Sequence, residues 1–326
     1  MVNRKMFVFI VACLLVALLI IIQSDVVGKP GFMVSKMSRT TPTSPLYNVV
    51  LVIIYHYPYY ETLPIIRSFY EKAFRKIIVC GAEANETLGI MGVAHENGYW
   101  GYECLGKAAR DYPGYEGYLQ IHDDILFQWW NVFSEDRTKI WLFGDHIEFN
   151  SGGVLGGEPP TDWPWWKKTN ILERTGEVLR DLRNNTEQPW INESFRIFYA
   201  NSGGNDTIPT SRGDIWYIPG RLAERLGYLS SLFFKHRVFL ETAVPTMMSF
   251  LDYTRNVQNP GGLYLSTKYG YGDSRDSPST FWSEYRKNLT FLHPFKLRGH
   301  DANLRILEEL VMPFVNNFVY KKILYV

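Results

Sequence analysis

The chain has 326 residues and a formal net charge of +1, with 34 Lys and Arg residues against 33 Asp and Glu residues. This length fits one large domain or two small ones. Because charge is balanced and no basic tract is present, nucleic acid is excluded as an expected partner. Aromatic residues make up 16% of the chain, which suits a large core, stacking on carbohydrate, or both.

An uninterrupted apolar run, MFVFIVACLLVALLIII, occupies residues 6–22 and follows Arg4 and Lys5. A membrane-spanning helix takes roughly 17–25 apolar residues, so the run is long enough to cross a bilayer. The basic residues favour a signal anchor with residues 1–5 in the cytosol and the rest of the chain on the far side. A cleaved signal peptide is the alternative, although IIQSDVVG offers no small-x-small cleavage site. Both interpretations predict that most of the chain is lumenal or extracellular.

Residues 23–45 are rich in Pro, Ser, Thr and Gly and lack periodicity, which predicts a flexible stem before a lumenal domain at 46–326. Cys13 lies in the apolar run, which leaves Cys80 and Cys104. These two either form a disulfide in an oxidising lumen or are two buried thiols. Acceptor motifs for N-glycosylation give further support for a secretory location, and they occur at Asn85, Asn184, Asn192, Asn205 and Asn288.

The folded part begins with a strand, a helix and a second strand. YNVVLVIIY at 47–55 and RKIIVCG at 75–81 are apolar runs that predict strands buried on both faces. Between them, residues 61–74 have helical spacing, with Pro64 in the first turn, where proline is tolerated. A βαβ unit implies a parallel sheet, so an α/β fold is expected.

The pattern continues along the chain. Further helices are predicted at 102–111, 165–182, 221–234, 238–251 and 301–314, and further strands at 117–121, 139–143, 195–200 and 214–218. Loops rich in Gly, Tyr and Ser cover residues 259–278. No internal repeat is visible, so we expect one α/β domain of about 280 residues.

The stretch GYLQIHDDILFQWW, residues 117–130, places Asp123 and Asp124 directly after a predicted buried strand. Ligands of open parallel sheets bind at the carboxyl ends of strands. Two neighbouring carboxylates can hold Mn²⁺ or Mg²⁺, and such a cation would stabilise a phosphate leaving group. The alternative is that the pair caps the following segment. The P-loop, dinucleotide, serine-hydrolase and zinc signatures are absent, which leaves carboxylate–metal chemistry as the best-supported class.

An apolar strand that ends in an acidic pair, after a βαβ unit and an N-terminal anchor, resembles the GT-A-fold glycosyltransferases. EGYLQIHDDILFQWWNVF, KIWL, GDIWYIPGRL, TAVPTMM and HPFKL resemble, in this order, the glycosyltransferase-like domain of the STELLO proteins of the Golgi membrane. The similarity covers residues 47–310, and its acidic block is the most specific.

This resemblance implies a GT-A-like (nucleotide-diphospho-sugar transferase) fold with a mixed, mostly parallel sheet flanked by helices. It implies a manganese- or magnesium-dependent hexosyl- or pentosyltransferase that uses a nucleotide-sugar donor and a glycan or glycoprotein acceptor. The expected location is the Golgi lumen, as a single-pass type II membrane protein anchored by residues 6–22. A non-catalytic Golgi assembly factor or carbohydrate-binding protein of the same fold is the alternative.

Under the resemblance, Asp123 and Asp124 take the role of the metal-binding Asp motif. His122 stands where a D-x-D motif has its first Asp, and its imidazole either ligates the metal or packs. His293, in FLHPFKL, is expected on the metal or the diphosphate, with Lys296 adding positive charge. A structural role for His293 is the alternative.

Candidates on the acceptor side come from the second half of the chain. Glu241, in RVFLETAVPT, is the candidate base that deprotonates an acceptor hydroxyl, because it is the only acid in that block. Its alternative is a helix first-turn carboxylate, which the helix dipole favours. Asp214, in SRGDIWYIP, either orients the acceptor or starts a strand.

Aromatic residues supply the last candidates. Tyr55 and His56 end the first predicted strand, where GT-A folds seat the nucleotide base, although an ordinary strand end is the alternative. DWPWW at 162–166 is a candidate acceptor platform, because exposed Trp faces stack on sugar rings. We expect Trp129 and Trp130 to pack in the core.

Overall fold

A computed structural model describes residues 44–161, 163–185 and 187–319. The predicted cytosolic tail and signal anchor, and almost all of the predicted stem, lie outside the described residues. Within these residues, no helix is both long enough and apolar enough to cross a bilayer.

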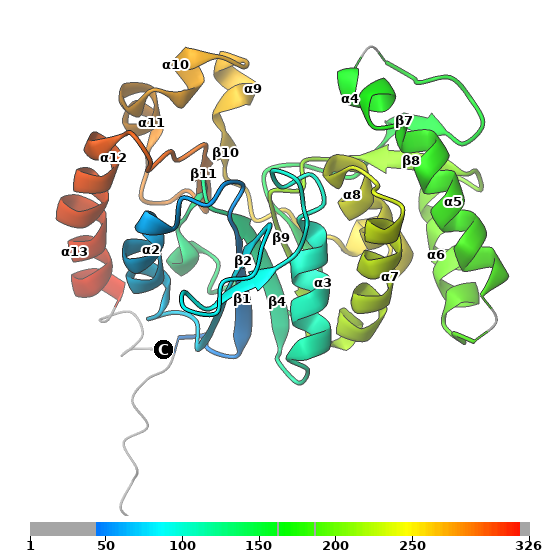
Figure 1. Cartoon of the computed structure of the whole chain (residues 1–326), viewed down its shortest axis with the longest axis horizontal. Helices are drawn as coiled ribbons and strands as arrows, with labels where there is room; N and C mark the ends of the chain where they lie inside the picture. The colour runs from blue at the N-terminus through cyan, green and yellow to red at the C-terminus, as the bar shows by residue number, and fades with distance from the viewer. Residues whose placement is uncertain (1–43, 162, 186, 320–326) are drawn as a thin grey trace, which may run out of the picture. The chain divides into compact units, whose positions relative to one another are not determined.

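A six-stranded sheet with the strand order β3-β2-β1-β4-β9-β6 forms the centre of the domain (Figure 1). Its strands are β1 (Val49–Ile54), β2 (Lys76–Gly81), β3 (Ile90–Gly92), β4 (Gly117–His122), β6 (Trp141–Leu142) and β9 (Ile215–Pro219). β1 is parallel to β2 and β4, and β2 is parallel to β3, whereas β9 is antiparallel to β4 and β6. The expected mixed, mostly parallel sheet flanked by helices is confirmed, and it fits a GT-A-like fold.

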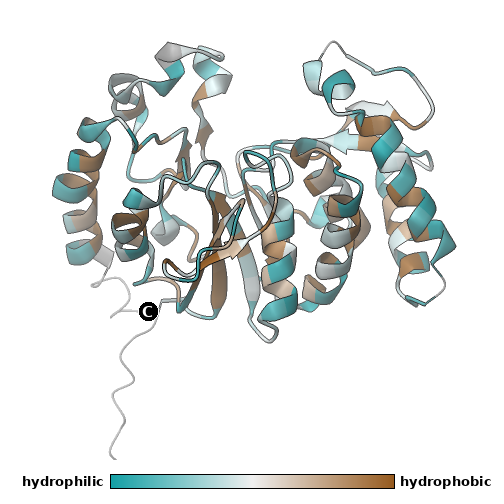
Figure 2. Cartoon of the chain, viewed as in Figure 1, coloured by the Kyte–Doolittle hydropathy of each residue, from teal (hydrophilic) through white to brown (hydrophobic). Residues whose placement is uncertain are grey.

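β1 and β4 lie in the middle of the sheet. Helices cover both faces of the sheet, so these two strands are enclosed on both sides. Every residue of these two strands is buried. Successive side chains of a strand point to opposite faces, so odd-numbered residues of β1 belong to one apolar cluster and even-numbered residues to another. Figure 2 shows β1 as hydrophobic and the helices as hydrophobic on one side.

Different helices complete the two clusters. α2 (Leu63–Tyr70) packs in the first cluster with the C-terminal segment that contains Leu307 and Val311. The second cluster is completed by α3 (Tyr102–Asp111), α5 (Ile171–Asn184), α6 (Ile191–Ser202), α7 (Ala223–Lys235) and α8 (Leu240–Leu251). Trp129 and Trp130 are buried in the first cluster, which confirms their expected core role.

Two smaller sheets were not predicted. One has the order β10-β11-β5 and contains β10 (Leu263–Tyr264), β11 (Phe291–His293) and β5 (Leu126–Phe127). The other pairs β7 (Glu148–Val154) with β8 (Thr207–Thr210). Strands as short as β5 and β10 carry no periodic signal. The pairing of β5 with β11 is nevertheless important, because it joins the segment after β4 to a segment late in the chain.

Three expected elements differ in the structure. The predicted strand at 195–200 is wrong, because these residues lie inside α6, whose buried residues Ile191, Ser194, Ile197 and Phe198 have helical spacing. The predicted helix at 165–182 is two helices, α4 (Pro164–Lys168) and α5, separated at Asn170 by a left-handed backbone with φ 48°. The predicted helix at 301–314 consists of α12 (Asp301–Ile306), a π-helical turn (Leu307–Val311) and α13 (Met312–Phe314).

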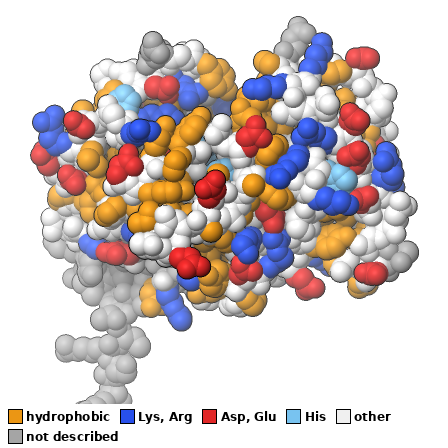
Figure 3. All heavy atoms as spheres, in the orientation of Figure 1, with side chains coloured by type: hydrophobic (Ala, Val, Ile, Leu, Met, Phe, Trp, Pro, Cys, Tyr) orange, Lys and Arg blue, Asp and Glu red, His pale blue; other side chains and the backbone are white. Residues whose placement is uncertain are grey.

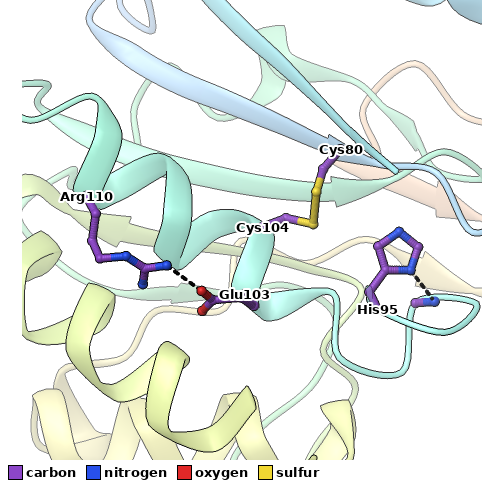
Figure 4. Close-up of a disulfide and its surroundings, with 6 residues drawn as sticks. Cys80, His95, Glu103, Cys104 and Arg110 are labelled. Atoms are coloured by element: carbon purple, nitrogen blue, oxygen red, sulfur yellow. Dashed lines mark hydrogen bonds and ion pairs between the residues drawn. A yellow bond between two sulfur atoms is a disulfide. The ribbon is translucent and has the colours of Figure 1, made fainter. Parts of the chain in front are cut away.

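The sheet and α3 are joined by a disulfide. Cys80 in β2 and Cys104 in α3 are both buried and are bonded to each other across 24 positions of sequence (Figure 4). Of the two alternatives for this pair, the structure has the disulfide. The ion pair between Glu103 and Arg110 lies on the same helix.

Glycine 106 allows α3 and α7 to pack closely. A Cβ atom at Gly106 would lie 1.6 Å from Ser230 Oγ, whereas one at Gly176, in α5, would meet only Leu155 at 4.0 Å. We expect Gly106→Ala to lower the free energy of unfolding by about 1–3 kcal/mol through overpacking. Gly176→Ala is the matched control and should raise it by about 0.5–1 kcal/mol, because Ala is the better helix former. Urea unfolding measures both, and equal signs would contradict the close packing.

Candidate active site

A cavity of about 740 Å³ lies at the carboxyl ends of β1 and β4. This volume is within the roughly 300–1,000 Å³ that is usual for small-molecule sites. Of the candidate residues named from the sequence, those that line it are His56, Asp123, Asp124, Asp214, His293 and Lys296. The structure therefore brings together residues that lie as far apart in sequence as His56 and Lys296.

The register of the central strands explains why the first of these residues meet. Ile54, the last residue of β1, is aligned with His122, the last residue of β4. The backbone N–H of Asp123 donates to the carbonyl of Ile54 at 2.8 Å, which holds the two strand ends together. His56 and the acidic pair therefore leave the sheet at the same edge, where ligands of parallel sheets bind.

His56, His122 and Asp124 form a cluster whose potential ligand atoms all lie within 4.8 Å of one another. The two imidazole rings meet edge to face, with centroids 4.4 Å apart. The Nε2 atom of His122 and the Oδ1 atom of Asp124 are buried and make no hydrogen bond to the described residues. Unpaired polar atoms are rare in protein interiors, so the cluster has the composition and spacing of a divalent metal site.

The donor set also bears on which metal fits. Mg²⁺ prefers oxygen ligands in octahedral geometry, whereas imidazole nitrogen suits first-row transition ions. Two imidazoles and one carboxylate therefore fit Mn²⁺ or another transition ion better than Mg²⁺. His122, which breaks the D-x-D pattern, lies inside this cluster.

The two adjacent carboxylates have different partners. Asp123 Oδ1 lies 2.8 Å from His56 Nδ1 and accepts from the His56 backbone N–H at 3.3 Å. Asp124 Oδ2 instead accepts from Lys296 Nζ and lies 3.4 Å from His293 Nε2. Asp123 thus orients a histidine of the cluster, while Asp124 is a member of it. Sequence reasoning treated the two as equivalent.

Burial and nearby charges set the protonation of the cluster. Burial raises the pKa of Asp124, but the positive charges of His293 and Lys296 outweigh it and hold this pKa well below the usual range. Burial lowers the pKa of His56, but the hydrogen bond to Asp123 and the charge of Asp124 raise it to about 9. The pKa of His122 is lowered, first by burial and then by the charge of His56. His122 is therefore neutral, the form of histidine that binds metals, whereas His56 holds a proton that a bound cation would displace.

Asp214 completes this group from β9. It immediately precedes the strand, and its Oδ1 atom lies 3.3 Å from His122 Nδ1. Burial raises the pKa of Asp214, but contact with His122 and the charge of His293 hold it below its usual value. Asp214 therefore stands beside one histidine of the cluster, as Asp123 stands beside the other.

The small sheet β10-β11-β5 places His293 and Lys296 beside Asp124. Leu292 of β11 pairs with Leu126 of β5, two residues after Asp124. β11 ends at His293, and the N–H of Phe295 donates to the backbone carbonyl of Asp124. His293 and Lys296 therefore reach the Asp124 carboxylate through a strand pairing that the sequence did not reveal.

A strained turn at residues 96–98 forms another wall of the cavity. Glu96, Asn97 and Gly98 all have a left-handed backbone, with φ 43°, 53° and 88°. The turn is held by buried His95, whose Nδ1 accepts from the N–H of Gly98 at 3.0 Å (Figure 4). Asn97 lines the cavity, and strain of this kind gathers at functional sites. Sequence reasoning missed this turn, although Asn-Gly is a turn signal.

Tyr55 does not line the cavity. Its ring is 1% exposed, and its hydroxyl bonds to Thr62 Oγ1 at 3.0 Å. Because the ring is enclosed, Tyr55 is not placed to stack on a nucleotide base, and we correct that expectation. Tyr57 and Tyr59 line the cavity instead, and their rings stack on each other with centroids 5.4 Å apart.

Glu241 lies in a second, smaller cavity of about 250 Å³ that shares no lining residue with the first. It occupies the first turn of α8. Burial, followed by the charge of Asp214, raises the pKa of Glu241 to about 8. Trp163 and Trp166 line the same small cavity, whereas Trp165 stacks on Phe239.

The raised pKa of Glu241 predicts a pH-dependent stability. Between the ordinary pKa of a glutamate and about 8, the folded chain holds a proton that the unfolded chain has lost. Stability from this group is therefore full at low pH and falls as pH rises. We expect Glu241→Gln to match the parent at pH 5 and to exceed it in the free energy of unfolding at pH 8.5. A difference that is constant with pH would contradict the burial of this carboxyl.

Fold and site together define a class: an α/β protein with a GT-A-like sheet and a divalent-metal type of cluster at the carboxyl ends of its central strands. The chain is 21% identical over 266 residues to the probable glycosyltransferase STELLO1 of Arabidopsis thaliana, covering 81% of this chain and 31% of the relative. It is 20% identical over 263 residues to the probable glycosyltransferase STELLO2 of the same plant, covering 81% of this chain and 32% of the relative. No protein-family model matches the chain.

These matches confirm the resemblance to the STELLO-type glycosyltransferase family. The names of both relatives support a transferase at the level of the family. The chain matches about a third of the length of each relative.

Proposed function

We propose that the chain is a metal-dependent glycosyltransferase that binds a nucleotide-sugar donor in the cavity of about 740 Å³. One observation carries the proposal: two members of the cluster, His56 and Asp124, line the same cavity as the cationic residues Lys296 and Arg298. A cation site beside fixed positive charges suits a ligand with a diphosphate group.

Different residues of the cavity would bind different parts of the nucleotide-sugar donor. His56, His122 and Asp124 would hold the cation, with Asp123 and Asp214 beside the two imidazoles. When bound, the cation supplies positive charge that stabilises the leaving nucleotide diphosphate. Lys296 stands beside Asp124 and adds a second positive charge to the site.

The rim of the cavity fits the nucleoside part. Tyr57 is 47% exposed and stacks on Tyr59, so an aromatic face is available for a base. The guanidinium of Arg298 lies 4.0 Å from the centre of the Tyr59 ring. Asn97, on the strained turn, adds an amide that can donate and accept hydrogen bonds.

A Golgi lumenal location, as a single-pass type II protein, belongs to the same proposal. It rests on the apolar run at 6–22 with its basic flank. The buried disulfide between Cys80 and Cys104 supports an oxidising compartment. The acceptor asparagines Asn192 and Asn205 are exposed, as glycosylation requires.

Thermal unfolding of the full-length chain with Mn²⁺, Mg²⁺, UDP and GDP tests the donor site. A ligand present at 100 times its Kd adds about 2.7 kcal/mol to the free energy of unfolding. We expect Mn²⁺ with a nucleoside diphosphate to raise the melting temperature more than either alone, and more than Mg²⁺ does. Asp111→Asn, on the exposed end of α3, is the control and should behave as the parent does.

A screen of nucleotide sugars for donor hydrolysis then separates an enzyme from a binding protein. Hydrolysis of one donor, dependent on Mn²⁺, would support the transferase. Binding without hydrolysis of any donor would favour the non-catalytic alternative, in which the same fold assembles with a partner or holds carbohydrate. No binding of any diphosphate would overturn the proposed donor site.

A further inference from the structure

The small cavity beside α8 has the lining of a carbohydrate site. It is formed by Asp145, Glu148, Thr161, Trp163, Trp166, Thr210, Ser211, Arg212 and Glu241. Its volume of about 250 Å³ lies just below the roughly 300–1,000 Å³ of pockets for drug-sized ligands. A space of this size suits one sugar ring.

The residues that line the cavity offer both kinds of contact that a sugar ring makes, apolar contacts and hydrogen bonds. Sugars present apolar C–H faces and a rim of hydroxyl groups. Trp163 and Trp166 give the cavity an aromatic surface for the C–H faces. The indole N–H of Trp166 already donates a hydrogen bond to Thr161 Oγ1 at 3.2 Å. The carboxylates and Arg212 can accept from and donate to the hydroxyls.

Glu241 is a polar group in this cavity that is free for a ligand. No hydrogen bond or ion pair to its carboxylate exists within the part of the chain that the structure describes, whereas Asp145 already accepts from two backbone N–H groups at 2.9 and 3.1 Å. A carboxyl that lines a cavity without a protein partner is available to a hydroxyl group of a bound molecule.

Contacts link the small cavity to the donor cavity. Arg212 lines the first, and Asp214, two residues later, lines the second. The Arg212 guanidinium lies 4.5 Å from the centre of the Tyr264 ring, which packs at 5.3 Å on the ring of His293 in the donor cavity. The charge of Asp214 also acts on Glu241. One wall, built from the Arg212–Asp214 segment and Tyr264, therefore separates the two cavities.

We propose that the small cavity is a carbohydrate subsite that binds one sugar ring of the acceptor. Trp163 provides the stacking surface, and Glu241 accepts a hydrogen bond from a sugar hydroxyl. Naming this sugar the acceptor rests on the proposed transferase function, but sugar binding itself does not.

Saturation-transfer NMR on the full-length chain tests the subsite with methyl glycosides of glucose, galactose, mannose, xylose and N-acetylglucosamine. We expect at least one glycoside to receive saturation at its ring protons. Glu241→Leu, which removes the hydrogen-bonding group, and Trp163→Leu should each weaken its binding at least tenfold. The matched controls are Glu224→Leu, in the first turn of α7, and Trp165→Leu, whose ring lies outside the cavity lining; both should bind as the parent does.

Each outcome decides the inference. Binding of no glycoside, or binding that is equal in Glu241→Leu and the parent, overturns it. Glycoside binding that depends on Glu241 while no nucleoside diphosphate binds leaves the subsite standing and removes the transferase proposal. If Trp163→Leu fails to fold, Glu241→Leu with its Glu224→Leu control still decides, because glutamate and leucine are similar in size.

Discussion

Asp124→Asn is expected to abolish the response of the protein to Mn²⁺ while leaving it folded. The substitution preserves shape but removes the only carboxylate of the three-residue cluster. The Lys296 ammonium that loses its partner is partly exposed and can turn to solvent. We expect Mn²⁺ affinity to fall by more than about 100-fold. This loss exceeds the usual effect of changing a residue that only orients a metal ligand. Donor turnover should fall by about 10²–10³ or more.

Asp123→Asn is the matched comparison, because it changes the neighbouring carboxylate in the same way. Asp123 contacts His56 and is not a member of the cluster. We therefore expect Mn²⁺ affinity to fall by only about 10- to 100-fold, as for other carboxylates that orient a ligating histidine. Isothermal titration with Mn²⁺ on both variants measures this. Equal losses, or a larger loss for Asp123→Asn, would show that the roles of the two residues are assigned the wrong way round.

Removing the disulfide is expected to have the largest effect on stability. Cys80 and Cys104 close a segment across 24 positions of sequence, and a closed loop of this size restricts the unfolded chain by roughly 3 kcal/mol. Cys80→Ala with Cys104→Ala should therefore lower the free energy of unfolding by at least roughly 3 kcal/mol, since the truncated side chains also leave space in the core. Each kcal/mol corresponds to roughly 2–4 °C in melting temperature for a large domain.

The parent chain unfolded with and without a reducing agent is the control for lost side-chain volume. Reduction relaxes the unfolded state and removes no core atoms, so its effect should be smaller than that of the double variant and of the same sign. The closed segment includes His95 and Asn97, so nucleotide affinity should also fall when the bond is lost. An unchanged unfolding midpoint under reducing conditions would contradict the pairing.

The sequence predicts those parts of the fold that have a long and unambiguous hydrophobic pattern. The runs 47–55 and 75–81 became β1 and β2 because they are rich in β-branched residues on both faces, and the run 117–121 became β4 although Ile121 is its only β-branched residue. The segment 195–200 was assigned to a strand because a six-residue window cannot distinguish a buried helix from a strand. β5 and β11 are too short to carry a pattern, and their pairing depends on tertiary contacts.

Some features of the candidate site could also be predicted from the sequence, and others could not. The rule that ligands bind at strand ends predicted that His56, His122 and the acidic pair would lie near each other. It could not predict which carboxylate faces which histidine, because that depends on side-chain direction at two consecutive residues. The turn at residues 96–98 is held by a local hydrogen bond from Gly98 to His95, and Asn97-Gly98 is a signal that could have revealed it.

The face of the domain that is visible in Figure 3 gives no sign of where the site lies. Figure 3 shows Lys and Arg side chains mixed with Asp and Glu side chains over the visible face, as the net charge of +1 would suggest. Electrostatic attraction of a nucleotide sugar therefore depends on local charges such as Lys296 and Arg298 in the cavity, and we expect it to act only at short range.

The pairing of β5 with β11 has a consequence for how the protein is made. The cluster residues His56, His122 and Asp124 leave the ribosome long before His293 and Lys296, which contact Asp124. A nascent chain that stops short of residue 296 therefore carries the buried Asp124 carboxylate without its counter-charges. The donor cavity is therefore completed only after residue 296 has been synthesised and β11 has paired with β5.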